Sequence, residues 1–291
     1  MLSDAYGRTV TNIRISLTHA CNLNCIYCHA EGEQHPEDEL PAGQIAEILR
    51  VARDFGFRSV KFTGGEPLMR DDLEEIVASV PEGMEASLTT NGTLLAGRAR
   101  ALKEAGLGRV NISLDTLDPE RYARIAGRPL LGDALAGIEA ALDAGLVPVK
   151  LNMVVLSGIN DDEIETFIDF VRDRHDLVLQ LIELMDFRDC PHHADVKGIE
   201  DRIAAIADRV ETRRMHHRKK YHVRGAEVEV VRPLHNTEFC AYCNRLRLTS
   251  DGWLKPCLLR TDNHVDIRGL HGAALEEAFR EAVRRREPYF A

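Results

Sequence analysis

Cys21-Asn-Leu-Asn-Cys25-Ile-Tyr-Cys28 is the stretch of the sequence that decides the fold. Its three cysteines are separated by three and then two residues, and they follow an apolar run at Asn12–Leu17 that is typical of a β-strand. In parallel α/β proteins the ligand site lies beyond the carboxyl ends of the strands. The motif therefore places three thiols at that edge, where soft sulfur ligands suit an iron–sulfur cluster or zinc.

The number of thiols indicates a reactive metal site. Three cysteines leave one iron of a four-iron cluster open, and an open coordination position distinguishes a reactive site from a structural one. The alternative is a zinc knuckle in which His29 is the fourth ligand. Zinc sites more often carry pairs of cysteines at two-residue spacing, so the iron–sulfur interpretation is favoured.

Short apolar runs alternate with helical patterns on either side of this motif. Strands are predicted at Asn12–Leu17, Ser59–Thr63, Ala86–Thr89, Val110–Leu114, Val147–Val155 and Val178–Leu184. Helices are predicted near Ala42–Phe55, Asp71–Ser79, Arg98–Ala105, Asp133–Ala144 and Asp161–Arg174. Six β–α units predict a parallel sheet, and they are too few for a closed eight-stranded barrel. The predicted fold class is α/β, an open partial (βα)6 barrel of the TIM type over residues 1–186.

Residues 187–291 are predicted to form a smaller C-terminal α+β domain that carries a second metal site and the substrate-binding region. The predicted elements are a loop at Arg188–His193, a helix at Ile199–Asp208, a strand at Glu227–Val231, a hairpin of Leu246–Thr249 with Trp253–Lys255, and a helix at Ala273–Arg286. The basic run Arg213–Lys220 is interpreted as a solvated loop, with approach to phosphates or to a partner as the alternative.

A second cysteine triplet lies in this region, at Cys240, Cys243 and Cys257. One interpretation is a zinc ribbon completed by His235 or His264. The other is a second cluster with an open iron, and the residues that follow Cys243 favour it. Arg245 and Arg247 are two apart on an extended segment, so they point to the same side and could clamp a phosphate group.

The composition of the chain argues against several classes of function. The formal net charge of −10 over 291 residues argues against a general nucleic-acid or anionic-membrane binder. The first residues lack the apolar run of a secretory signal, and no stretch approaches the length of a membrane span. A cytoplasmic location, where thiols stay reduced, is expected, and the seven cysteines then indicate metal ligation. Cys190 stands alone and is interpreted as a packing residue.

The first motif resembles the signature of the radical S-adenosylmethionine (SAM) superfamily, in which the open iron chelates SAM and the reduced cluster cleaves it to a 5′-deoxyadenosyl radical. Thr63-Gly64-Gly65-Glu66-Pro67, after the second predicted strand, matches the SAM-contacting loop of that superfamily. The resemblance implies that Cys21, Cys25 and Cys28 hold the catalytic cluster. It also implies SAM contacts at Tyr27, Gly65, Ser113 and Met185.

The second string, from Phe239 to Leu258 with its Asn-Arg-x-Arg segment, closely resembles the GTP 3′,8-cyclase family, known as molybdenum-cofactor biosynthesis protein A. The likeness extends from Gly7 to about Leu258. It implies that the open iron of the second cluster binds guanine. Contacts to GTP are implied at Arg14, Lys61, Thr89, Lys150, Arg245 and Arg247, with the last two assigned as catalytic.

This resemblance implies a reaction in which the 3′ hydrogen of the GTP ribose is removed and the sugar carbon attacks C8 of guanine. The product, 3′,8-cyclo-7,8-dihydro-GTP, would pass to the next enzyme of molybdenum-cofactor synthesis, and an electron donor is required. The protein is expected to be a monomer or a homodimer.

Two positions depart from the family: the chain ends without the Gly-Gly that many members carry, and Gln180 stands where many have an arginine.

Two other functions would share part of this cysteine pattern. A radical SAM enzyme that matures a peptide would share the first motif but would usually carry more cysteines downstream. A zinc-stabilised binding protein without catalysis would share only the cysteines. A count of about eight irons in protein purified without oxygen would separate the cluster enzymes from the zinc protein.

Overall fold

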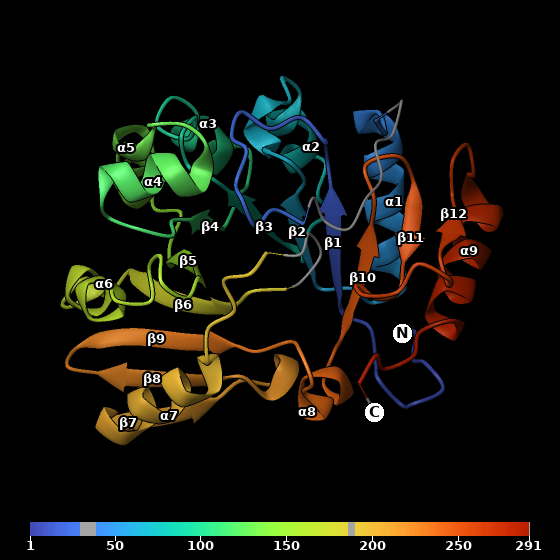
Figure 1. Ribbon diagram of the computed structural model, residues 1–291. Helices are drawn as coiled ribbons and strands as arrows, with labels where there is room; N and C mark the ends of the chain where they lie inside the picture. Colours follow the sequence, from blue (N-terminus) through green and yellow to red (C-terminus); the bar gives the residue numbers. More distant parts are fainter. Residues whose placement is uncertain (30–38, 186–189, 291) are drawn as a thin grey trace.

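The computed structural model describes residues 1–29, 39–185 and 190–290, and the strands among them form one twelve-stranded sheet. Its parallel centre consists of β1 (Asn12–Ser16), β2 (Ser59–Thr63), β3 (Glu85–Thr90), β4 (Arg109–Ser113), β5 (Val149–Val155) and β6 (Leu177–Glu183). These strands are adjacent in chain order, as expected for successive β–α units (Figure 1). The sheet does not close, which confirms the predicted open α/β barrel.

Successive side chains of each central strand point to opposite faces, and the two faces differ in polarity. In β1, Ile13 and Ile15 are fully buried in the apolar core, whereas Asn12 and Arg14 line a cavity on the other face. The helices that accompany the central strands are α1 (Ala42–Asp54), α2 (Leu73–Ala78), α3 (Ala99–Glu104), α4 (Pro119–Ala126), α5 (Leu131–Asp143) and α6 (Ile164–Val171). The apolar face therefore builds the core, and the polar face is available for a ligand.

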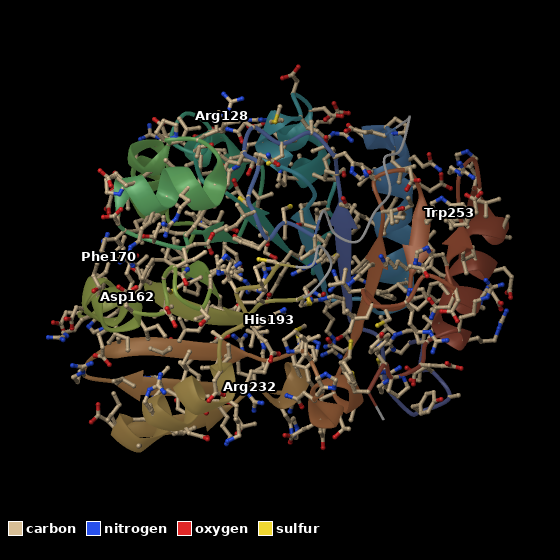
Figure 2. All side chains as sticks on the ribbon, viewed as in Figure 1. Arg128, Asp162, Phe170, His193, Arg232 and Trp253 are labelled. Carbon is tan, nitrogen blue, oxygen red and sulfur yellow. The ribbon has the colours of Figure 1, made fainter. Side chains whose placement is uncertain are left out.

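The C-terminal region extends the same sheet at both of its edges. On one side are β7 (Arg209–Thr212), β8 (Lys219–Val223) and β9 (Ala226–Val231), and on the other β10 (Arg245–Leu248), β11 (Trp253–Lys255) and β12 (Val265–Asp266). β9 pairs in parallel with β6, and β10 pairs in parallel with β1. Figure 2 shows the span of this sheet, with Phe170 on α6 and Trp253 on β11 at opposite sides of the molecule.

The helices of this region are α7 (Val196–Ile206), α8 (Thr237–Ala241) and α9 (Gly272–Arg284). A domain boundary near residue 186 remains a prediction, because residues 186–189 lie outside the described part of the chain, as does the start of the predicted loop at Arg188–His193. No helix among the described residues is long and apolar enough to cross a lipid bilayer.

Two local predictions need correction. The sequence analysis did not predict α4, although its signals are present: Asp118 accepts a hydrogen bond from the backbone nitrogen of Arg121, Pro119 is the first helical residue, and Gly127 ends the helix with a φ of 74°. The basic run Arg213–Lys220 is not a solvated loop. It contains the helical turn η3 (Met215–His217) and the start of β8, and His216 within it is buried.

Candidate functional site

A cavity of about 460 Å³ opens on the polar face of the sheet. It is lined by the residues that the sequence analysis selected: Cys21, Cys25, Tyr27, Cys28, Gly65, Ser113 and Met185 from the first group, Cys240, Cys243 and Cys257 from the second, and Arg14, Lys61, Thr89, Lys150, Arg245 and Arg247 from the cationic set. The fold therefore brings both triplets and the selected cations to one chamber.

The first triplet lies on the loop that follows β1. Its thiols are unpaired by disulfides and close enough to influence one another. Burial raises the pKa of the Cys25 thiol, and Asp115, Cys28 and Cys21 raise it further. Burial likewise raises the pKa of Cys21. Three free thiols that line one cavity from a single loop are soft donors of the kind that iron–sulfur clusters use, so the donor set fits a cluster.

Close backbone packing positions this loop. A Cβ added at Gly65 would lie 2.3 Å from the carbonyl oxygen of Ala20, and one at Gly64 would lie 2.5 Å from that of Thr18. Backbone hydrogen bonds from Gly65 to Thr18 and from Glu66 to Ala20, both 2.7 Å, join the two segments. The two glycines are thus required for contact with the cysteine loop, in addition to lining the cavity.

Two buried carboxylates lie near this triplet. Asp115 accepts a 2.6 Å hydrogen bond from the Tyr27 hydroxyl and a 2.9 Å bond from the backbone nitrogen of Val154, while burial raises its pKa to about 6. Glu66 is fully buried and accepts hydrogen bonds from the Thr90 hydroxyl and the Asn91 backbone nitrogen, both 2.7 Å. These bonds fix Tyr27 beside the triplet and tie the loops after β2 and β3 together.

The second triplet is held by residues from distant parts of the chain. Cys240 lies on α8, and Arg8 donates a 2.9 Å hydrogen bond to its carbonyl oxygen. The fully buried Arg286 donates a 2.7 Å bond to the carbonyl oxygen of Cys243 and a 2.9 Å bond to Asp4. Both arginines line the cavity, and the sequence analysis selected neither as a site residue.

The charge around the second triplet is positive. Burial alone would raise the pKa of the Cys243 thiol, but Arg286, Arg245 and Arg247 outweigh it, and the pKa is lowered. At Cys257 burial dominates and the pKa is raised, with Cys243 and Cys240 contributing. Cys243 and Cys240 both influence Cys257, and the three arginines favour the thiolate form of Cys243 that a metal requires.

Strand register explains how the cations of the cavity meet. Arg14 in β1 lies opposite Lys61 on β2 and opposite Arg247 on β10. Burial lowers the pKa of Lys61, and Arg14 and Arg245 lower it further. Arg245 itself donates a 3.0 Å hydrogen bond to Asn12. Such a gathering of buried positive charge is costly unless an anion neutralises it.

Neutral polar groups complete this part of the cavity. The buried hydroxyl of Thr89 has no hydrogen-bond partner among the described residues. Asn111, which lies opposite Thr89 in the register, accepts a 2.8 Å hydrogen bond from Lys61. An unsatisfied hydroxyl beside clustered cations fits a bound polar anion, because a buried polar group is normally hydrogen-bonded.

The basic run, for which approach to phosphates was the alternative to a solvated loop, contributes a cationic wall to the cavity. Arg213, Met215, His216 and Arg218 line the cavity, and His216 stacks on Phe239 with ring centroids 3.7 Å apart. The density of charge in the run was visible in the sequence, but its pairing with a distant strand was not. Cys190 is buried in a small apolar cluster with Leu156 and Leu184, as expected for a packing residue.

Comparisons with known proteins agree with these features. Residues 15–171 match the model of the radical SAM superfamily, and residues 177–291 match the model described as Molybdenum Cofactor Synthesis C. A protein of Methanocella arvoryzae named probable GTP 3′,8-cyclase is 52% identical over 100% of this chain and 95% of its own length. Proteins of the same name from Archaeoglobus fulgidus and Pyrococcus abyssi are 48% and 47% identical, also over 100% of this chain.

Solved structures share the fold at low sequence identity. Streptococcus suis SuiB bound to S-adenosylmethionine has a TM-score of 0.67 at 18% identity, covering 94% of this chain and 66% of its own. The structure described as native anSMEcpe with bound AdoMet has a TM-score of 0.62 at 17% identity, covering 93% and 81%. At such identities the likeness concerns the fold alone.

Proposed function

Because the chain belongs to the radical SAM superfamily and to the GTP 3′,8-cyclase family within it, we propose that the cavity on the polar face of the sheet binds SAM beside the first triplet and GTP beside the second. The activity is the conversion of GTP to (8S)-3′,8-cyclo-7,8-dihydro-GTP, the first step of molybdenum-cofactor biosynthesis. The observation that carries the assignment of residues is that both cysteine triplets and the cationic set line the same cavity.

Each triplet would hold one four-iron cluster, and the two clusters with SAM would supply the electron and the radical that start the reaction. Cys21, Cys25 and Cys28 would hold the first cluster, with Tyr27, Gly65, Ser113 and Met185 around SAM. Cys240, Cys243 and Cys257 would hold the second. Among the described residues, no group of three or more histidine, cysteine or carboxylate side chains is placed to hold a metal ion.

The cationic set would hold the nucleotide. Arg14, Lys61 and Lys150 project from parallel strands, and Arg245 and Arg247 project from β10 beside them. Their charges match a triphosphate, and the free hydroxyl of Thr89 can serve a ribose or phosphate oxygen. Fixing both ends of GTP between these residues and the second triplet would present its ribose to the SAM side.

The walls of the chamber would protect a reactive intermediate. The chamber is bounded by the sheet on one side and by residues from both the N-terminal and the C-terminal regions, including Arg8, Arg286 and Tyr289. A reactive intermediate must be kept from water and from stray hydrogen donors while it lasts. The polar face of the sheet supplies the binding groups, and the C-terminal segments supply the cover.

An anaerobic incubation with SAM, GTP and a reductant tests the proposal. Formation of 5′-deoxyadenosine together with a cyclised nucleotide is the expected result, and 5′-deoxyadenosine without a cyclised nucleotide would exclude GTP as the substrate. Iron and sulfide counts on the same preparation should approach about eight of each. Four irons, or zinc in place of iron, would exclude the second cluster.

A peptide substrate is the second candidate, because the structure of Streptococcus suis SuiB bound to the precursor peptide SuiA shares this fold. The relatives at about half identity are named probable GTP 3′,8-cyclase, which favours GTP. We further propose a cytoplasmic location, where the seven thiols stay reduced, an external electron donor, and transfer of the product to the next enzyme of the pathway.

A further inference from the structure

A buried carboxylate lies behind the cationic wall of the cavity, and the proposed function assigns it no role. Glu229 on β9 is fully buried. Lys150 and Arg213 each donate to its Oε1 over 2.5 Å. Gln180 donates to its Oε2 over 2.8 Å, and a nitrogen of Arg218 lies 3.6 Å from the same oxygen. Three cations and one amide therefore converge on a single carboxylate.

The tertiary fold creates this convergence. β9 pairs with β6, which sets Glu229 opposite Gln180, and β5 adjoins β6, which brings Lys150 within reach. Arg213 and Arg218 flank η3 between β7 and β8, and a 2.8 Å backbone hydrogen bond from Arg213 to Arg218 closes that connection. The two arginines are thus fixed side by side, with Glu229 beneath them.

The charges in this group do not balance. Burial would raise the pKa of Glu229, but Lys150, Arg218 and Arg213 outweigh it and hold the pKa at about 2. Burial lowers the pKa of Lys150 only to about 8, so the lysine also stays charged at neutral pH. One negative charge therefore faces three positive charges. A carboxylate that served only to neutralise a buried lysine would not need two more cations.

The surplus charge is directed into the chamber. Arg213 and Arg218 line the cavity, as does Lys150, whereas Glu229 lies behind them. The buried Nε of Arg218 has no hydrogen-bond partner among the described residues. A guanidinium has five N–H donors, so each arginine that meets Glu229 through one nitrogen keeps others for a ligand. Gln180, on the neighbouring strand, supplies a hydrogen bond to Glu229 but no charge.

We propose that Arg213 and Arg218 are phosphate-binding residues of the nucleotide site and that Glu229 is the positioning residue that holds them. This inference rests on the proposed function, since it assumes a nucleoside triphosphate in the chamber. Guanidinium groups form bidentate pairs with phosphate oxygens, and two of them beside Lys150 suit a polyphosphate better than a purine ring. Gln180 on β6 carries no charge, so the positive charge of this wall comes from Arg213 and Arg218 in the β7–β8 connection.

The test compares nucleotides that differ only in phosphate. The affinities of the cluster-loaded protein for GTP and for guanosine are measured anaerobically, without SAM, for the wild type and for the double variant Arg213→Met/Arg218→Met. The expected loss for GTP is about tenfold for each arginine, with guanosine affinity unchanged within about twofold. The salt dependence of GTP binding should also weaken. Arg214→Met is the matched control, because Arg214 belongs to the same run but is exposed.

Two outcomes would decide against the inference. Unchanged GTP affinity in the double variant would remove the arginines from the site. Equal losses of affinity for GTP and for guanosine would show that the role of the two arginines is structural. Failure of the wild type to bind either ligand would instead overturn the proposed function. If the double variant does not fold, the single variants Arg213→Lys and Arg218→Lys, which keep the charge opposite Glu229, are tested in the same way. They should lose GTP affinity and keep guanosine affinity, because an ammonium cannot replace a bidentate guanidinium.

Discussion

The two cysteine triplets provide the same ligands in opposite electrostatic surroundings. Near the first triplet lie the buried carboxylates Asp115 and Glu66, and Asp115 raises the pKa of Cys25 beyond the effect of burial. Near the second lie the arginines at 245, 247 and 286, which lower the pKa of Cys243 despite burial. Negative surroundings disfavour the addition of an electron and positive surroundings favour it. The first cluster is therefore expected to be the stronger reductant.

The triplets also differ in how the chain holds them. The first lies on a loop fixed by backbone contacts with Gly64 and Gly65 and by the Tyr27–Asp115 hydrogen bond. The second depends on two arginines, Arg8 and Arg286, that come from the two ends of the chain and reach the carbonyl oxygens of its cysteines. The two triplets thus share a cysteine pattern that predicts a metal site, and they differ in the groups packed around them.

Removal of one thiol from each triplet should give the largest difference in products between the two sites. In Cys25→Ser, formation of 5′-deoxyadenosine and of cyclised nucleotide should both fall to background, because the site that activates SAM is lost. In Cys243→Ser, cleavage of SAM should persist while the cyclised nucleotide disappears. Both products are measured chromatographically from one anaerobic reaction. Loss of SAM cleavage in both variants would break the assignment of separate roles.

Gly65→Ala should damage the first site selectively. The added Cβ would meet the Ala20 carbonyl oxygen at 2.3 Å, and relief requires backbone movement, at a cost of about 3 kcal/mol in the free energy of unfolding. The iron content should fall toward that of the second cluster alone. Gly132→Ala in α5 is the control, since nothing lies within 4 Å of its Cβ position, and it should stabilise by about 0.5 kcal/mol. Denaturant unfolding and iron analysis measure both effects, and equal behaviour of the two variants would contradict the packing argument.

Arg286→Gln should affect the second site selectively. Loss of the buried guanidinium removes bonds to Asp4 and to the Cys243 carbonyl and should cost about 2 kcal/mol of stability. Loss of the positive charge should lower the reduction potential of the second cluster, by roughly 60 mV for each 1.4 kcal/mol of lost charge stabilisation. Redox titration followed by electron paramagnetic resonance measures the potentials. Arg285→Gln, at an exposed position, should leave both clusters unchanged, and a shift confined to the first cluster would reverse the comparison.

The pH dependence of GTP binding should give the smallest effect. The pKa of Lys150 is lowered to about 8, chiefly by burial, with Glu229 opposing and Arg213 and Arg218 adding to the shift. The ammonium loses its proton as the pH rises through 8, so GTP affinity should fall by up to about tenfold between pH 7 and pH 9. Guanosine affinity should stay constant, and Lys150→Met should remove the pH dependence. Titration calorimetry at fixed ionic strength measures these affinities, and a pH-independent GTP affinity in the wild type would remove Lys150 from the phosphate contacts.

The local sequence was sufficient for the central sheet. The strands β1 to β6 and most of the helices were predicted within a few residues, because apolar periodicity and glycines at helix ends are local signals. The cysteine spacings likewise indicated two metal sites. The first triplet lies within one short segment, and the cysteines of the second lie on either side of one hairpin. The helix α4 was missed only because its capping signals at Asp118 and Gly127 were not used.

The tertiary structure decided how those segments combine. Pairing of β10 with β1 sets Arg247 beside Arg14, and pairing of β9 with β6 sets Glu229 against Gln180 and beneath Arg213. Strand partners and registers between segments so far apart in the chain depend on which faces can be buried together, a property that no local pattern contains. The sequence by itself thus predicted which groups would carry the proposed chemistry. Only long-range strand pairing determined that one set of thiols would face carboxylates and the other arginines.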